Sequence, residues 1–312
     1  MRAVVVRAFG GPGALEVAEV ALPGVGAGQV RVRVAAAGVN PVDALTRAGV
    51  LAQAGLMAAR EVTGIGWDVA GVVDGVGDKV TGFEPGQRVV GLRDRLDVDL
   101  GAYAQFAVLD AGALAPAPTG VDFAQAATLP LNGLTAWQAL DLLDLPAGAS
   151  VLVTGAAGAV GGFAVELAAL RGLRVVAVAG AGDEALVRSL GAEWFVPRTA
   201  PDLAAAVREL VPGGVDGALD PALLGVTALG AVRGRGVFVA VAGGSEPVGL
   251  RGIRVANVWV SADGAALARL SALAEEGRLT LRLAGTLPLE RAREAHERLA
   301  EGGLRGRLVL VP

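Results

Sequence analysis

The stretch VLVTGAAGAVGGFAVELAAL, residues 151–170, decides the fold of this chain. It opens on a run typical of a β-strand, continues with glycines at Gly155, Gly158 and Gly161, and ends on a helical pattern. Glycines at these places permit a tight exit from the strand, a close approach of the backbone to a pyrophosphate, and close packing of helix on strand. The helix N-terminus then offers backbone N–H groups to the anion. The stretch therefore predicts the turn of a dinucleotide-binding domain, with Ala159 and Val160 as further cofactor-binding candidates.

A transmembrane helix is the competing interpretation of the same stretch. Gly158 and Gly162 have the small-residue spacing of membrane helix dimers. However, Glu166 has no cationic partner within the stretch, and the first residues are strand-like. The helix that follows the glycines would be about 18 Å long, against the ~30 Å of a bilayer core. We therefore expect no membrane span.

Length and composition favour a protein of two domains. The chain has 312 residues, of which 53% are hydrophobic, and a net charge of −4. This length fits two domains, and the negative charge argues against nucleic acid as a partner, because phosphates attract basic surfaces. The start of the chain lacks the basic and apolar segments of a secretory signal.

The chain has no cysteine, and His296 is its only histidine. Protein zinc sites draw mainly on cysteine and histidine, and catalytic zinc usually has three protein ligands, so we expect no zinc site and no other metal site. Nucleophilic pairs of the Ser–His type could use only His296, which lies in an amphipathic helical pattern typical of a packed residue. Disulfides are excluded, which agrees with a cytoplasmic protein.

The pattern of elements changes along the chain. Residues 1–115 read as short strands broken by glycine and proline, which predicts a barrel-like β domain. From about residue 123 a helical pattern over 124–139 is followed by strands that alternate with helices. Six strands with helical crossovers predict an α/β fold with a doubly wound parallel sheet. They are expected at 150–154, 174–179, 194–196, 215–219, 236–241 and 257–260.

Two families of reductases have a glycine turn of this general kind. Short-chain dehydrogenases place TGxxxGxG near the N-terminus and use a Tyr-x-x-x-Lys pair. Here the only tyrosine, Tyr103, stands four residues before Ala107, so this family is excluded. The chain instead resembles the zinc-independent quinone oxidoreductase branch of the medium-chain dehydrogenase/reductase superfamily, which includes zeta-crystallin. The resemblance is carried by the glycine turn and by GVNPVDALTRAG (38–49), GWDVAGVVDGVGDKVTGFEPGQRV (66–89), GAYAQFAVL (101–109), LPLNGLTAWQAL (129–140) and PLERAREAHERLAEGGLRGRLVL (288–310).

The resemblance implies a discontinuous architecture. A GroES-like β-barrel substrate domain would comprise residues 1–120 and 261–312, and a Rossmann domain would comprise residues 121–260. It also implies a homodimer formed through the last Rossmann strand near residues 257–260, a run that lacks the charges expected on an exposed edge.

The resemblance also places two candidate catalytic residues. Asn40 stands where the family has a cleft residue near the nicotinamide, although Asn-Pro is also a common turn former. Thr135 stands at a helix start that the family uses to support the nicotinamide, and a plain N-cap would explain it equally well. Asp68 is interpreted as a structural hydrogen-bonding residue. Several relatives have a tyrosine where this chain has Leu45, which weakens any side-chain proton donor there.

NADPH is favoured over NADH at the end of the second Rossmann strand. NAD enzymes place a carboxylate there, whereas residues 179–181, with Gly180 at their centre, carry none. Arg198 matches a position that lines the adenosine phosphate pocket in relatives, and its planar fork suits phosphate. Glu184 stands where some relatives have a lysine, which argues the other way. Ala242 and Gly243, after the predicted strand 236–241, complete the cofactor-binding candidates.

These observations predict an NADPH-dependent reductase that transfers hydride to a quinone or an activated α,β-unsaturated carbonyl without zinc. Such acceptors spread negative charge over their own conjugated system and need little help from an acid or a metal. Two alternatives stay open, namely an enoyl-thioester reductase and a non-catalytic NADPH-binding protein.

Overall fold

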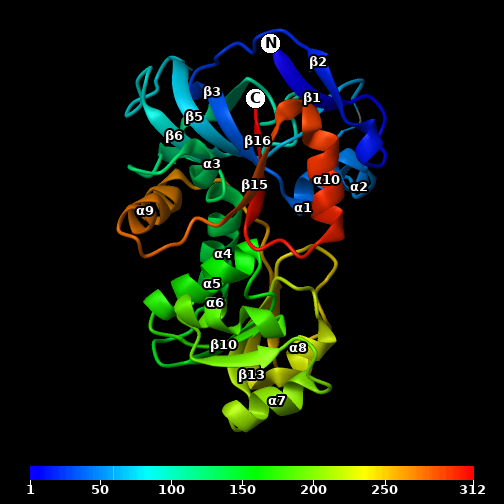
Figure 1. Cartoon of the computed structure of the whole chain (residues 1–312), viewed down its shortest axis with the longest axis vertical. Helices are drawn as coiled ribbons and strands as arrows, with labels where there is room; N and C mark the ends of the chain where they lie inside the picture. Colours follow the sequence, from blue (N-terminus) through cyan, green and yellow to red (C-terminus); the bar gives the residue numbers. More distant parts are fainter. Residues whose placement is uncertain (59) are drawn as a thin grey trace. The chain divides into compact units, whose positions relative to one another are not determined.

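The structure is a computed structural model that describes residues 1–58 and 60–312 (Figure 1). It divides into two compact units. The first unit comprises Met1–Leu131, Ser261–Gly277 and Leu281–Pro312, and the second comprises Asn132–Val260 and Arg278–Thr280. The first unit thus runs eleven residues past the expected boundary at 120, since it keeps a short helix and the start of the next one.

The first unit is built mainly from β-strands. Its larger sheet has the order β15-β16-β3-β5-β6-β8, with β7 also paired to β3, and a smaller sheet has the order β2-β1-β4. In Figure 1, β3, β5 and β6 run side by side. The strands are β1 (Arg2–Val6), β2 (Glu16–Glu19), β3 (Gln29–Gly38), β4 (Thr63–Gly64), β5 (Asp68–Val76), β6 (Arg88–Leu92), β7 (Phe106–Asp110), β8 (Leu114–Pro116), β15 (Leu283–Pro288) and β16 (Arg307–Val311). The helices are α1 (Pro41–Arg47), α2 (Val50–Gln53), α3 (Phe123–Ala126), α9 (Gly264–Glu275) and α10 (Ala292–Glu301).

The second unit holds a six-stranded sheet in the order β11-β10-β9-β12-β13-β14, and every neighbouring pair is parallel. This is the strand order of a dinucleotide-binding Rossmann domain, which confirms the predicted parallel sheet. Its strands are β9 (Ser150–Val153), β10 (Arg174–Ala179), β11 (Trp194–Pro197), β12 (Val215–Asp220), β13 (Val232–Ala240) and β14 (Arg254–Asn257). Its helices are α5 (Ala159–Leu170), α6 (Glu184–Ser189), α7 (Leu203–Leu210) and α8 (Val226–Ala231), while α4 (Pro130–Leu143) begins in the first unit and continues in the second.

The central strands of this sheet are apolar because they are buried. All four residues of β9 are buried, and so are the last five of β10. Leu152, Val176, Ala218 and Phe238 lie together in the core of the second unit. Near-continuous apolar strands of this kind are typical of a parallel sheet that is covered on both faces.

The helical pattern predicted over 124–139 is confirmed for most of its residues, but it forms two helices instead of one. α3 ends at Ala126 and α4 starts at Pro130. A proline lacks the N–H that would continue a helix and disfavours the helical conformation in the residue before it. At the first position of a new helix the missing N–H costs nothing, so Pro130 separates the two helices.

The last strand of the parallel sheet also differs from its prediction. The apolar run 257–260 predicted a strand, but β14 is Arg254–Asn257 and the residues after it are not in a strand. The register explains the shift, because β13 ends at Ala240, and Ala240 is the partner of Asn257. The outer strand therefore carries a charged residue, Arg254, whereas the predicted run 257–260 carries none.

Among residues 1–58 and 60–312, no helix combines the length and the apolar character needed to cross a bilayer.

Candidate cofactor-binding site

The predicted glycine turn lies between β9 and α5. Gly155 has a φ of 57°, in the left-handed region that glycine adopts without strain. The N–H of Gly158 donates to the carbonyl oxygen of Gly155 at 2.8 Å. A Cβ on Gly161 would lie 2.1 Å from that same oxygen, so only glycine fits where the helix crosses the turn. Gly155 and Gly161 therefore permit a tight turn of the backbone between β9 and α5.

The turn leaves its backbone accessible at the start of α5. Gly155, Gly158, Ala159 and Val160 are all partly exposed, whereas Gly161 is buried under the turn. Gly158 is the N-cap residue of α5, and Ala159 and Val160 form the first turn of this twelve-residue helix. The unpaired N–H groups of such a helix start suit a phosphate. The turn therefore fits the pyrophosphate of a dinucleotide.

Two buried polar residues that the sequence interpretation missed form hydrogen bonds directly beside the turn. The hydroxyl of Thr154 donates to Asp220 Oδ1 at 2.5 Å and accepts from the N–H of Ala222 at 3.0 Å. Asp220 Oδ2 accepts from the N–H of Gly225 at 2.8 Å. This clamp joins the ends of β9 and β12. A carboxylate at the end of an apolar strand was the available signal for Asp220.

Gly180 and Arg198 lie at the ends of two neighbouring strands. Gly180 follows β10 and Arg198 follows β11, and the N–H of Arg198 donates to the carbonyl oxygen of Ala179 at 2.7 Å. Arg198 is exposed, and its side chain makes no hydrogen bond or ion pair with any residue of 1–58 or 60–312. Glu184, the residue that argued against NADPH, accepts from Arg188 Nε at 2.8 Å. Its carboxylate is therefore balanced within α6, and Arg198 stays available for an anion.

Ala242 and Gly243 follow β13 at the same edge of the sheet. A Cβ on Gly243 would lie 2.5 Å from Cη2 of Trp259, so the indole rests directly on this glycine. All of the cofactor-binding candidates from Gly155 to Gly243 therefore stand at or beyond the carboxyl ends of parallel strands, where ligands of open α/β sheets bind.

Asn40 stands in a different environment, within the first unit. It is fully buried, and its Nδ2 donates to Asp68 Oδ2 at 2.6 Å. Its backbone N–H donates to Asp43 Oδ2 at 2.7 Å, which caps α1. Tyr103 donates its hydroxyl to the same Asp43 oxygen at 2.9 Å, and Asp68 Oδ1 accepts from the N–H of Leu131 at 2.7 Å. Asn40 is thus part of a buried polar network.

Burial governs the charges of this network. It raises the pKa of Asp43 to about 7 and that of Asp68 to about 6, because an ionised carboxylate is poorly solvated in the core. The guanidinium of Arg307, itself buried, lowers both pKa values and donates to the carbonyl oxygen of Val39 at 3.2 Å. Asp68 begins β5 and has the structural role that the sequence predicted.

The single histidine is a packed residue. His296 is buried in α10, and its Nδ1 accepts from Arg47 Nη1 at 3.0 Å, since arginine can only donate. Burial, followed by the charge of Arg47, lowers the pKa of His296 to about 4. Its ring meets Tyr103 edge to face with the centroids 5.9 Å apart. Within the described part of the chain, no group of three or more histidine, aspartate and glutamate side chains could hold a metal ion.

The predicted helix start at Thr135 is wrong. Thr135 is the sixth residue of α4, which begins at Pro130, so it is not an N-cap. It is buried within the second unit. Leu45 lies on α1 and is 41% exposed.

The chain matches two family descriptions. Residues 26–119 match "Alcohol dehydrogenase GroES-like domain", and residues 190–310 match "Zinc-binding dehydrogenase". A quinone oxidoreductase from Pseudomonas aeruginosa is 31% identical over 98% of this chain and 98% of its own length. The NADPH-dependent alkenal/one oxidoreductase of Arabidopsis thaliana chloroplasts is 30% identical over 100% of this chain and 80% of its own length. A crystal structure described as an NAD-dependent alcohol dehydrogenase superposes with a TM-score of 0.90, at 33% identity over 100% of both chains.

Proposed function

The chain belongs to the medium-chain dehydrogenase/reductase superfamily, and from that membership we propose that it reduces quinones or activated α,β-unsaturated carbonyls with NADPH. The observation that carries the proposal is the glycine turn at Gly155–Gly161 in a Rossmann-ordered sheet, within a chain that aligns end to end with a quinone oxidoreductase. An α/β Rossmann domain and a GroES-like domain are the shared architecture of this superfamily.

We propose a separate role for each candidate residue in binding the cofactor. We assign the pyrophosphate to the backbone of the turn from Gly155 to Gly161, with the N–H groups of Ala159 and Val160 at the start of α5 as donors, and the 2′-phosphate to the guanidinium of Arg198. Bound NADPH supplies a hydride to the acceptor. Asn40 is proposed as a positioning residue that fixes the start of α1, since its amide is already engaged by Asp68. Thr135 is proposed to support the nicotinamide end from within α4.

We propose that the reaction needs no zinc, although one matched family description names this metal. The chain has no cysteine, and its one histidine is buried against Arg47. Quinones and activated enones hold negative charge in their own conjugated system, so orientation in the site supplies most of the catalysis. The proton then comes from water or from a neutral side chain other than Leu45, which is apolar.

Turnover by protein treated with a chelator tests this function. We expect oxidation of NADPH, followed by its absorbance, with 1,4-naphthoquinone or an enone as acceptor. Turnover of crotonyl thioesters alone would instead identify an enoyl-thioester reductase. NADPH binding without turnover of any acceptor would identify a non-catalytic protein. Alcohol oxidation that depends on added zinc would contradict the proposal.

The role of Arg198 gives a prediction about cofactor choice. The choice needs a test because one structural relative is described as NAD-dependent. Arg198→Ala should raise the KM for NADPH about tenfold, the worth of a hydrogen bond to a charged group, and leave the KM for NADH unchanged. Arg174→Ala is the matched control, because this exposed arginine stands at the other end of β10 and pairs with Glu193. Equal changes for NADPH and NADH would show that Arg198 does not read the 2′-phosphate.

A homodimer and a cytoplasmic location stay predictions. β14 supports the first, because it is the outer strand of its sheet within the described residues and its chain continues into the exposed Trp259. The lack of cysteine supports the second.

A further inference from the structure

The strand order of the second unit predicts which half of the cofactor lies over which half of the sheet. The sheet reverses its direction of winding between β9 and β12, and the glycine turn follows β9. In this fold each half of the sheet binds one mononucleotide, and the pyrophosphate crosses at the reversal. Because Gly180 and Arg198 end strands on the side of β10 and β11, the nicotinamide half belongs over the ends of β12, β13 and β14.

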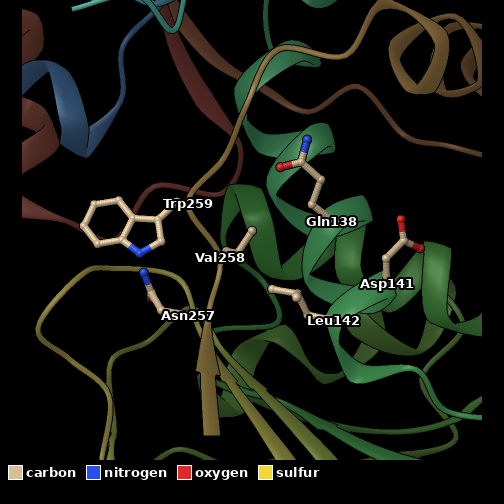
Figure 2. Close-up of a pocket in the computed structure, with 6 residues that line it drawn as sticks. All are labelled: Gln138, Asp141, Leu142, Asn257, Val258 and Trp259. Atoms are coloured by element: carbon tan, nitrogen blue, oxygen red, sulfur yellow. The ribbon is translucent and has the colours of Figure 1, made fainter.

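The last residue of β14 carries an unsatisfied amide at this place. Nδ2 and Oδ1 of Asn257 are both buried, and neither has a hydrogen-bond partner among residues 1–58 and 60–312. A buried amide without partners costs free energy, and native proteins keep one only where something repays the cost. Figure 2 shows the amide of Asn257 directed toward the indole of Trp259, whereas the side chain of Val258 lies on the side of α4. This alternation is that of an extended chain.

Trp259 covers the amide and is itself largely exposed. Its side chain is 64% exposed, and its ring rests on Gly243, which offers no side chain to pack against it. Asn257 and Trp259 also line a pocket of about 430 Å³, with Gln138, Asp141 and Leu142 of α4 on its other wall. Displacing this exposed indole would open the amide of Asn257 to a small planar group, which could then stack on the indole.

We propose that the side chain of Asn257 binds the carboxamide of the nicotinamide. A primary carboxamide has one acceptor and one donor group, and the amide of Asn257 offers the complementary donor and acceptor. Pairing the two satisfies both buried atoms of Asn257 and fixes the rotation of the nicotinamide ring. Asn257 thereby determines which ring position of the cofactor faces the acceptor. This inference rests on the proposed use of a nicotinamide cofactor.

Binding of two ligands separates this role from folding and from the proposed function. We expect Asn257→Leu to weaken NADP⁺ about tenfold in calorimetry, since one or two hydrogen bonds are lost. The same variant should bind 2′,5′-ADP, which has the adenosine half and no nicotinamide, as tightly as the wild type does. Leu250→Ala is the control, because it shortens an exposed side chain of the same unit outside this pocket and should leave both affinities unchanged.

An altered cofactor tests the contact from the ligand side. The 3-acetylpyridine analogue of NADP⁺ has a methyl ketone in place of the carboxamide and so lacks its N–H donor. The wild type should prefer NADP⁺ over this analogue several-fold. Asn257→Leu should reduce that preference, whereas Asn257→Asp should retain it, because a carboxylate still accepts the carboxamide N–H. This comparison holds even if Asn257→Leu folds poorly, because the wild type alone must discriminate.

Three outcomes would overturn the inference or its premise. Equal affinity of the wild type for NADP⁺ and the analogue would overturn it, and so would an unchanged preference in Asn257→Leu. Failure of the wild type to bind NADP⁺ while it binds NADH would move the inference to NAD⁺ and its acetylpyridine analogue and would contradict only the choice of NADPH. Failure of the wild type to bind any of these ligands would overturn the proposed function together with the inference.

Discussion

Arg307→Met should lower the free energy of unfolding by about 3–5 kcal/mol, the cost of removing one member of a buried charge cluster. Arg307 is buried near Asp43 and Asp68, and its charge lowers the pKa of both carboxyls. Methionine fills a similar volume but leaves these groups without their cation. Denaturant unfolding measures the loss, and Arg305→Met is the control because Arg305 is exposed two residues earlier.

The loss should depend on pH in a definite direction. In the native state the pKa values of Asp43 and Asp68, about 7 and about 6, lie above their unfolded values, so folding favours the protonated forms. Without Arg307 both native values rise further, and the added penalty accumulates only where the carboxyls would ionise. The variant should therefore lose more stability at pH 8 than at pH 5. A loss that is equal at the two pH values would show that packing, not charge, is the role of Arg307.

Gly161→Ala should weaken NADPH binding about 100-fold, the worth of one or two hydrogen bonds to a charged phosphate. The added Cβ would lie 2.1 Å from the carbonyl oxygen of Gly155 and 2.9 Å from Cα of Ala156, so the turn must open to admit it. Overpacking of this kind should also cost about 1–3 kcal/mol of stability. Fluorescence titration with NADPH and thermal unfolding measure the two effects.

Gly182→Ala is the matched control for this change. A Cβ on Gly182 would have no heavy atom within 4 Å, and Gly182 lies in the same unit. It should therefore bind NADPH and unfold as the wild type does. If Gly161→Ala also bound NADPH with wild-type affinity, the turn would not be the pyrophosphate site.

The parallel sheet could be predicted because its signals are local. Apolar strands, glycines at strand ends and intervening helical patterns reflect burial and backbone geometry within a few residues of each other. The boundaries were less predictable where a partner decides them. The end of β14 depends on where β13 ends, and the sequence around Asn257 does not contain that information.

The polar networks were less predictable because their members lie far apart in the sequence. Asn40 and Asp68 are 28 residues apart, and Thr154 and Asp220 are 66 residues apart. Nothing in the spacing of such residues shows that the sheets bring them together. Asn40 was selected by its likeness to a family position, and its engagement with Asp68 became visible only in the folded chain.

The Thr154–Asp220 clamp has a consequence for the order of events during folding. Thr154 directly follows β9 and Asp220 ends β12, and these two strands lie on opposite sides of the point where the sheet reverses its winding. The first half of the sheet can therefore assemble as the chain is made, but the hydrogen bonds beside the turn form only when β12 has docked beside β9. Contacts of such long sequence separation form late, because the intervening chain must first be ordered. A ligand that binds only the completed turn consequently stabilises the complete sheet relative to partly folded forms that lack this turn.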